Sequence, residues 1–218
     1  MSGLLMKDLE LIKINMKTYL AVFLIGLIYL VAHENGSTFF VAYATFVSIG
    51  VSVGTISYDG YHHGMRFLMT LPITKEQYVQ SKYLLSFCFA VLVSAASLLL
   101  GIIRIQISGN QKVEDLLIST GVALVISGII LCGMIPLRLK YEAEKSRVVM
   151  VAAVAVIFLI AAACKKLYDL YRESFGKGFQ FLNTLSGGQI AIILIIVIAI
   201  CIAASMKVSE RIMEGKEF

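Results

Sequence analysis

The sequence predicts an all-α integral membrane protein with six transmembrane helices and an N-terminal interfacial helix. Of its 218 residues, 59% are hydrophobic and 15% are charged, and the mean hydropathy is +0.87. Soluble domains are roughly 45 to 50% apolar and about 25% charged, since water must meet a largely polar exterior. A protein in hydrocarbon can be apolar both inside and outside. The composition therefore favours a lipid bilayer as the surroundings of this chain.

Six apolar runs approach the length of about 17 to 25 residues that a helix needs to cross the bilayer. They comprise residues 18–32, 39–57, 83–103, 116–137, 148–164 and 189–206. The first run is short, but Lys17 can reach the membrane surface while its helix continues from earlier residues. Because five further spans follow, we interpret this run as an anchor rather than a cleaved signal peptide. The predicted transmembrane domain covers residues 18–206, and a tail of residues 207–218 follows it.

Residues 1–17 predict a helix that lies along the membrane surface. One face carries apolar residues and another carries charged ones, as expected for an interfacial helix. The apolar face would hold Leu5, Leu9, Ile12 and Met16, and the charged face Lys7, Glu10, Lys13 and Lys17.

The distribution of Lys and Arg predicts the orientation. These residues are about twice as frequent in the N-terminus, the loops 58–82 and 138–147 and the C-terminus as in the intervening segments. Both termini are therefore expected in the cytoplasm, with the protein in the cell membrane. The outer loop 165–188 carries four basic residues among aromatic ones, which we interpret as an amphipathic segment at the outer surface. Basic residues form no single patch, so nucleic acid is not an expected partner.

The apolar runs contain no ionisable residue near their middle. Ion-coupled and proton-coupled carriers usually need such groups to bind the coupling ion, so the sequence disfavours secondary transport. The four cysteines lie far apart in or beside apolar runs and show neither a disulfide framework nor a zinc spacing.

Small hydroxyl residues recur at spacings of three or four along the second run. We call this set the hydroxyl stripe: it consists of Thr45, Ser48, Ser52 and Thr55. Gly50 and Gly54 beside it form a pair that lets helices approach closely. Helix packing is the favoured interpretation, and lining of a transport pathway is the alternative.

Two short motifs suggest chemistry that the rest of the chain does not support. Leu185-Ser186-Gly187-Gly188-Gln189 spells the signature motif of ATP-binding-cassette (ABC) ATPases, but no G-x-x-x-x-G-K-[ST] phosphate loop is present. We interpret Ser186 as a helix cap and the glycines as a flexible entry to the last span. Asp59, His62 and His63 resemble a metal or acid-base cluster, yet no third strong ligand follows, so a solvated polar face is favoured.

The segment 59–83 reads DGYHHGMRFLMTLPITKEQYVQSKY and resembles the membrane subunit of type-2 ABC exporters, in the branch of short bacterial permeases. The resemblance rests on an acidic residue, a glycine, a basic residue, the Leu-Pro-Ile-Thr-Lys run, a valine and Lys-Tyr. These are Asp59, Gly64, Arg66, Leu71-Pro72-Ile73-Thr74-Lys75, Val79 and Lys82-Tyr83. The N-terminal Lys7-Asp8-Leu9 is also similar to the opening helix of that family, whereas His62-His63 departs from its usual charged residues.

The chemistry of this segment fits such a role. Pro72 stops a helix, and Thr74 can cap a new one with Glu76 and Gln77 in its first turn, so the loop is expected to form two short helices. A rigid cytoplasmic helix is what an ATPase would grip to move the spans. An ordinary connector is the alternative.

The resemblance implies a permease that pairs with a second copy or a paralogue above two cytoplasmic ATPases, which would hold the ATP and magnesium. No cofactor is expected in this chain. The residues implied to couple to the ATPase are Gly64, Arg66, Leu71, Pro72, Thr74 and Lys75. The resemblance also implies that transport is export and that the N-terminal helix contacts the ATPase. It further implies that the outer loop forms re-entrant helices. Apolar spans suit an amphipathic substrate such as a peptide, drug or lipid. The alternatives to a permease are a membrane enzyme and a non-transporting scaffold or immunity protein.

Overall fold

The structure is a computed structural model, and it describes residues 2–60, 64–108, 112–141 and 187–216. These ranges fold into seven helices. The helices are α1 (Ser2–Ile14), α2 (Met16–Ala32), α3 (Gly36–Gly60), α4 (Gly64–Thr70), α5 (Lys75–Ser108), α6 (Val113–Lys140) and α9 (Gly187–Glu214).

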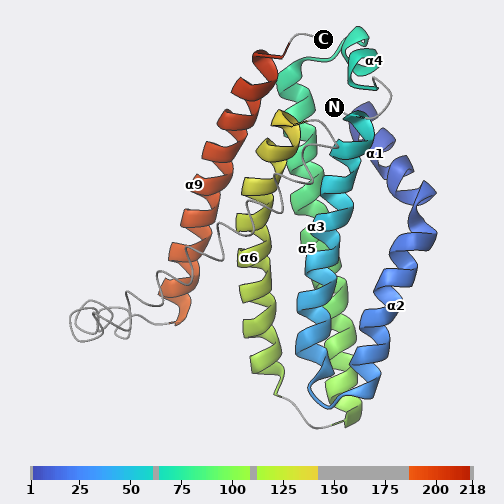
Figure 1. The fold of residues 1–218 in the computed structure, drawn as a ribbon. Helices are drawn as coiled ribbons and strands as arrows, with labels where there is room; N and C mark the ends of the chain where they lie inside the picture. Colours follow the sequence, from blue (N-terminus) through green and yellow to red (C-terminus); the bar gives the residue numbers. More distant parts are fainter. Residues whose placement is uncertain (1, 61–63, 109–111, 142–186, 217–218) are drawn as a thin grey trace, which may run out of the picture.

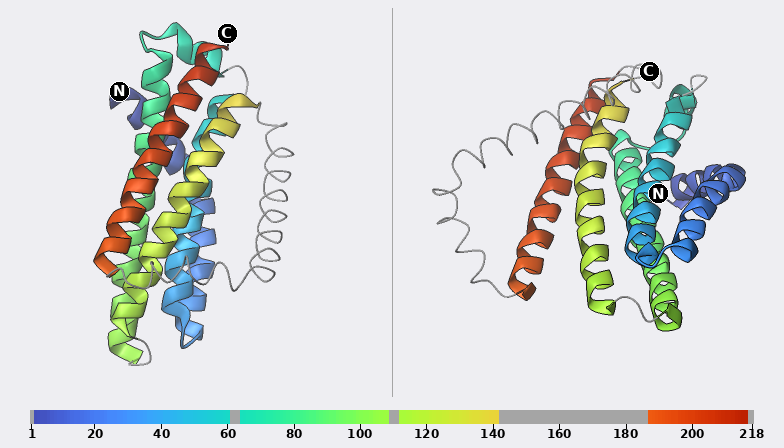
Figure 2. Two further views of the ribbon diagram at one scale, coloured as in Figure 1. Left: turned by 90° about the vertical axis from the view of Figure 1, so that its left-hand side faces the viewer. Right: turned by 60° about the horizontal axis from the view of Figure 1, so that its bottom comes forward.

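The long helices form a bundle with α3, α5 and α6 at its centre (Figure 1). α3 packs against both α5 and α6, α2 covers α3, and α9 packs against α6 and α5. Figure 2 shows the same arrangement from two further sides. The N-terminus, α4 and the C-terminal end of α9 lie at one end of the bundle, while α2 and α5 end at the other (Figure 1). The all-helical prediction is confirmed for the described part of the chain.

Three of the described helices, α3, α5 and α6, are long and apolar enough to cross a membrane. α1 and α2 add a fourth span if the pair, bent by 66°, is counted as one. The predicted last span lies inside α9, and the predicted fifth span, 148–164, lies outside the described residues, as does most of the outer loop. The structure thus supports a helical membrane protein with fewer demonstrated spans than the six predicted.

Apolar side chains cover both the interior and the exterior of the bundle. α3 is the most enclosed helix: Phe40, Val41 and Ala44 are fully buried. α2 approaches α3 closely at Gly26, where an added Cβ would lie 2.7 Å from the ring of Tyr43. Large apolar side chains on the outer faces are exposed, as expected for surfaces in lipid. Examples are Leu24, Ile28, Leu92, Leu99, Ile129 and Ile200.

α1 meets the bundle along one side, and its place along the membrane surface stays a prediction. Leu4 and Asp8 are buried, whereas Leu9 of the predicted apolar face is exposed. Met16, predicted on the same face, begins α2 and is also exposed. Lys7, predicted on the charged face, turns inward to α3. The periodicity of the apolar residues hid this pattern because a charged residue occupies a buried position.

The segment between α3 and α5 also differs from the prediction. Only one short helix forms, α4, and the expected second one is the start of the 34-residue helix α5. Pro72 lies in the break between them, where a helix cannot continue. α5 therefore runs without a break from Lys75, at this end of the bundle, into the apolar part of the bundle.

Candidate functional site

Residues 64–75 contain the positions that the resemblance implies to couple to an ATPase, and we call them the coupling segment for that expectation. The segment lies at the end of the bundle that carries both chain termini (Figure 1). Gly64 begins α4 close to the end of α3: an added Cβ would lie 2.9 Å from the backbone carbonyl oxygen of Asp59. Arg66 and Phe67 point outward, and the Phe67 side chain is 69% exposed. Leu71 in the break is also exposed. The segment thus presents a basic and an apolar residue on a short helix fixed tightly against α3.

Thr74 caps α5, as predicted. The Gln77 backbone N–H donates to the Thr74 Oγ1 at 3.1 Å, and the Thr74 N–H donates to the Gln77 Oε1 at 3.3 Å. This reciprocal pair is a capping box, which satisfies two backbone donors at the start of a helix. The position of α5's first turn is therefore set by local chemistry at the break.

Lys75 joins the start of α5 to the other end of the chain. Its Nζ donates to the carbonyl oxygens of Glu214 at 3.1 Å and of Lys216 at 2.7 Å. Carbonyls at a helix C-terminus lack intrahelical partners and carry partial negative charge, so an ammonium group stabilises them. This contact links the coupling segment to the end of α9.

Four charged residues from three helices meet beside the coupling segment. We call them the ion cluster: Lys7 and Asp8 from α1, Asp59 from α3 and Lys82 from α5. The Lys82 Nζ lies 2.7 Å from both carboxylate oxygens of Asp8 and 2.7 Å from the Asp59 Oδ2. Lys7 donates to the other Asp59 oxygen and lies 3.2 Å from Asp8. Two positive and two negative groups therefore balance.

The ion cluster is buried, so each of its charges depends on its partners. The Asp8 and Lys82 side chains are 0% and 1% exposed, and Asp59 is also buried. Two neutral groups complete the contacts, since the Tyr78 hydroxyl donates to the Asp59 Oδ2 at 2.9 Å and the Lys82 Nζ lies 3.4 Å from the Thr55 Oγ1. Removing one partner of a buried ion pair typically costs about 3 to 5 kcal/mol, because a charge is left uncompensated.

A second polar contact connects α5, α6 and α9, and we call it the hydroxyl relay. It consists of Tyr83, Ser205, Ser209 and the backbone carbonyl of Cys132. The Tyr83 hydroxyl lies 2.5 Å from the Ser205 Oγ and 2.9 Å from the Ser209 Oγ. Ser205 in turn donates to the Cys132 carbonyl oxygen.

Pro136 explains why that carbonyl needs a partner. It lies inside α6 and has no N–H, so the carbonyl four residues earlier, that of Cys132, loses its helical hydrogen bond. In an apolar environment a side-chain hydroxyl from a neighbouring helix is one of the few available donors. Ser205 supplies it from α9, which ties α9 to α6.

The hydroxyl stripe is buried inside this chain. Thr45, Ser48 and Thr55 donate to backbone carbonyls of α3 itself, those of Val41, Thr45 and Ser52. The Ser52 Oγ is buried and has no hydrogen-bond partner among the described residues. These contacts are typical of polar residues that pack within a bundle, the interpretation favoured from the sequence.

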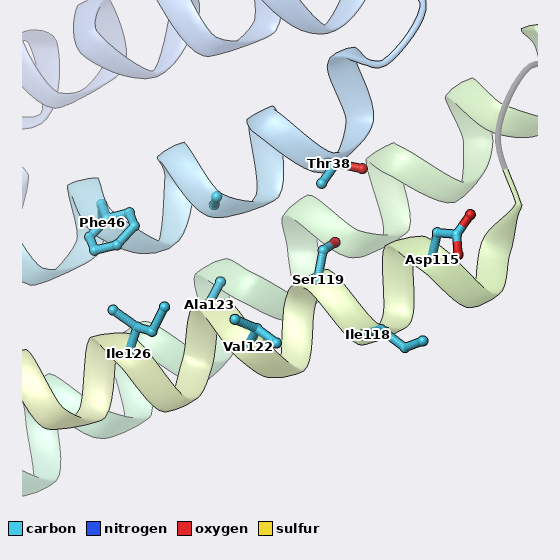
Figure 3. A pocket seen from close by; sticks show the side chains of 9 residues that line it. Thr38, Phe46, Asp115, Ile118, Ser119, Val122, Ala123 and Ile126 are labelled. Carbon is cyan, nitrogen blue, oxygen red and sulfur yellow. The ribbon is translucent and has the colours of Figure 1, made fainter. Parts of the chain in front are cut away.

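A groove runs between α3 and α6 at the far end of the bundle from α4. Figure 3 shows its lining, with Thr38 and Phe46 from α3 facing Asp115, Ser119 and Ile126 from α6. Its volume is about 350 Å³ and most of its lining is apolar. A neighbouring cavity of about 830 Å³ shares its charged end and adds polar residues there. Those residues are Asn35, Lys112 and Glu114.

The metal or acid-base interpretation of Asp59, which the sequence disfavours, has no support in the contacts of this residue. Asp59 is buried and paired with two lysines, so the solvated face favoured for it from the sequence is wrong. His62 and His63 lie outside the described residues, within which no group of three metal-ligating side chains occurs. The signature-like motif is described only from Gly187, where α9 begins, so Ser186 as a cap stays a prediction.

All four members of the ion cluster stand out in the sequence, but their meeting is not evident from it. Asp59, Lys82 and Lys7-Asp8 entered as separate matches to one family's pattern, at three places in the chain. Opposite charges at the edges of apolar runs were the available signal, because such charges are rarely buried unless paired. The hydroxyl relay was missed, although Pro136 inside an apolar run indicated a carbonyl in need of a donor.

Long apolar helices that bury a balanced ion cluster and a hydroxyl relay define a polytopic helical membrane protein. Residues 3–214 match the family model described as ABC-2 family transporter protein. Since the match covers nearly the whole chain, the chain belongs to the ABC-2 transporter family and is an ABC transporter permease. No curated protein and no solved structure gave a significant match.

Proposed function

We propose that this permease exports an amphipathic substrate with energy from a separate cytoplasmic ABC ATPase that binds the coupling segment. Family membership supports a role in ABC transport. The observation that carries the proposal is α4, a short helix with exposed Arg66 and Phe67 that lies in the chain between two long apolar helices. An exposed aromatic and an exposed cation on a short helix suit a protein partner, because such residues dominate interfaces.

α4 is connected firmly enough to pass on a displacement. Gly64 packs against the Asp59 backbone, the Thr74 capping box fixes the start of α5, and Lys75 holds the end of α9. A force on α4 would therefore move α3, α5 and α9 together, the kind of rigid-body motion used in conformational switching.

The groove between α3 and α6 supports the choice of substrate class. Its apolar wall with a charged end, near Asp115, matches a molecule with an apolar body and a polar or cationic group. Peptides, drugs and lipids share this chemistry.

The remaining parts of the proposal concern partners and orientation. A second copy or a paralogue would complete the pathway, and ATP and magnesium would bind to the ATPase. The common placement of α4 and both termini at one end of the bundle supports a cytoplasmic assignment for all three.

Affinity purification from the native cell tests the proposal. The permease should bring down an ABC ATPase whose hydrolysis rate rises with substrate in reconstituted vesicles. Replacing Phe67 with alanine should reduce the amount of ATPase recovered severalfold. Phe39→Ala, a change of another exposed aromatic at the opposite end, is the matched control and should leave recovery unchanged.

Two results would contradict the proposal. One is the absence of any ATPase from the purified material. The other is labelling of a cysteine placed at Arg66 by an impermeant reagent added outside intact cells, tested in a background without the native cysteines.

A further inference from the structure

α1 is attached to the bundle mainly through charge. Its contacts to α3 and α5 centre on Leu4 and on the ion cluster, and the rest of its surface is largely exposed. Met6, Leu9 and Ile14 are exposed apolar residues on that surface. Such residues suit the membrane interface and provide no fixed position relative to α5. The position of α1 therefore depends on the ion cluster.

The ion cluster joins the two helices that flank the coupling segment. Asp59 lies in the last turn of α3, and Lys82 lies about two turns into α5. One carboxylate, that of Asp59, receives Lys7 from α1 and Lys82 from α5, while Lys82 also binds both oxygens of Asp8. The ion cluster thus connects the end of α3 to the first part of α5, on either side of α4, and binds α1 to both helices.

We propose that the ion cluster is a joint that makes α1 move as one body with the start of α5, so that α1 follows the coupling segment during transport. Asp8 and Lys82 are the positioning residues of this joint. The part of the proposal that concerns transport rests on the proposed function, whereas the joint itself exists without an ATPase.

Charge suits a joint better than apolar packing would in this place. Apolar surfaces bury equally well in neighbouring registers, whereas short ion pairs with buried partners allow one arrangement. α1 also has the lipid surface as a competitor for its apolar side chains, but lipid hydrocarbon cannot compete for Asp8. A polar joint therefore keeps α1 attached in a membrane where apolar contacts alone provide little preference.

A distance measurement between α1 and α5 tests the joint. Spin labels are placed at Glu10 and Glu76, both exposed, in the full chain without native cysteines and reconstituted in nanodiscs. Electron paramagnetic resonance should give one narrow distance distribution. The double variant Asp8→Asn/Lys82→Gln, which keeps the cluster neutral and leaves Lys7 paired with Asp59, should add a broad second population.

Controls separate the joint from general damage. Asp115→Asn, a change of an exposed acid at the far end of the bundle, should leave the distribution narrow. Lys82→Arg should also keep it narrow, because the positive charge is retained. Thermal unfolding of the double variant verifies that the bundle itself remains folded.

The outcomes distinguish the two proposals. A narrow distribution in the folded double variant, or a broad one in the parent chain, would overturn the joint whether or not an ATPase binds. In the complex trapped with a non-hydrolysable ATP analogue, the distance between the labels should stay the same while α4 moves, and a separation of α1 from α5 would also overturn it. If no ATPase copurifies, the function proposed above fails while the measurement in nanodiscs still decides the joint.

Discussion

The ion cluster and the hydroxyl relay include neighbouring residues of α5, Lys82 and Tyr83, yet they differ in chemistry and in the helices that they connect. Lys82 turns to α1 and α3, and Tyr83 turns to α9, because successive residues on a helix point about 100° apart. The ion cluster uses full charges at the end of the bundle that carries α4. The hydroxyl relay uses only neutral groups and repairs a carbonyl freed by a proline.

The difference shows how the location of a polar contact limits its chemistry. A charge is costly in hydrocarbon, and the ion cluster accordingly lies beside the coupling segment, near the ends of the apolar runs. Neutral hydroxyls cost less and can connect helices inside the apolar part, at about 0.6 kcal/mol for each average contact. Together the two contacts bind α1, α3 and α9 to α5 by polar groups, and Ser205 of α9 extends this connection to α6.

Replacing Lys82 with methionine should have the largest effect. It leaves Asp8 and Asp59 buried with Lys7 as their sole cation, so the free energy of unfolding should fall by about 3 to 5 kcal/mol. Reversible unfolding in mixed micelles measures this change. Lys112→Met, a change of an exposed lysine, is the control and should have little effect. Equal stability of the two variants would mean that the ion cluster is not buried as described.

Removing the Ser205 hydroxyl should have a smaller effect. Ser205→Ala leaves the Cys132 carbonyl without its donor, and an unsatisfied buried acceptor costs about 1 to 3 kcal/mol. Pro136→Ala restores the backbone N–H that this carbonyl lacks. The loss caused by Ser205→Ala should therefore shrink in the Pro136→Ala background, measured as a double-mutant cycle by the same unfolding assay. Additive losses would refute the role assigned to Pro136.

Removing the Tyr83 hydroxyl should cost less again. Tyr83→Phe keeps the ring in place and leaves Ser205 bonded to the Cys132 carbonyl, so only neutral, adaptable partners are lost. The free energy of unfolding should fall by about 1 kcal/mol. Tyr43→Phe, which removes a hydroxyl bonded to the Val22 carbonyl between α2 and α3, is a matched comparison. A loss as large as that of Lys82→Met would erase the distinction between the two polar contacts.

The sequence was most informative where one residue type decides the local structure. Pro72 indicated the break because proline cannot continue a helix. Thr74 indicated the start of α5 because a hydroxyl side chain favours the cap position. The apolar runs likewise predicted the long helices. The meeting of Lys7 and Asp8 with Asp59 and Lys82 could not be predicted, because it depends on the 66° bend between α1 and α2 and on helix packing. The apolar periodicity of residues 1–17 likewise did not indicate that Asp8 would be buried.

The smallest expected effect concerns the hydroxyl stripe. The Ser52 hydroxyl is buried without a partner among the described residues, so Ser52→Ala removes a group that burial penalises. The free energy of unfolding should stay the same or rise by up to about 1 kcal/mol. Ser48→Ala removes a hydrogen bond to the Thr45 carbonyl and should lower it by a few tenths of a kcal/mol, roughly the value for a weak contact between membrane helices. If Ser52→Ala keeps stability but abolishes transport by the complex, the stripe lines the pathway, and packing is not its main role.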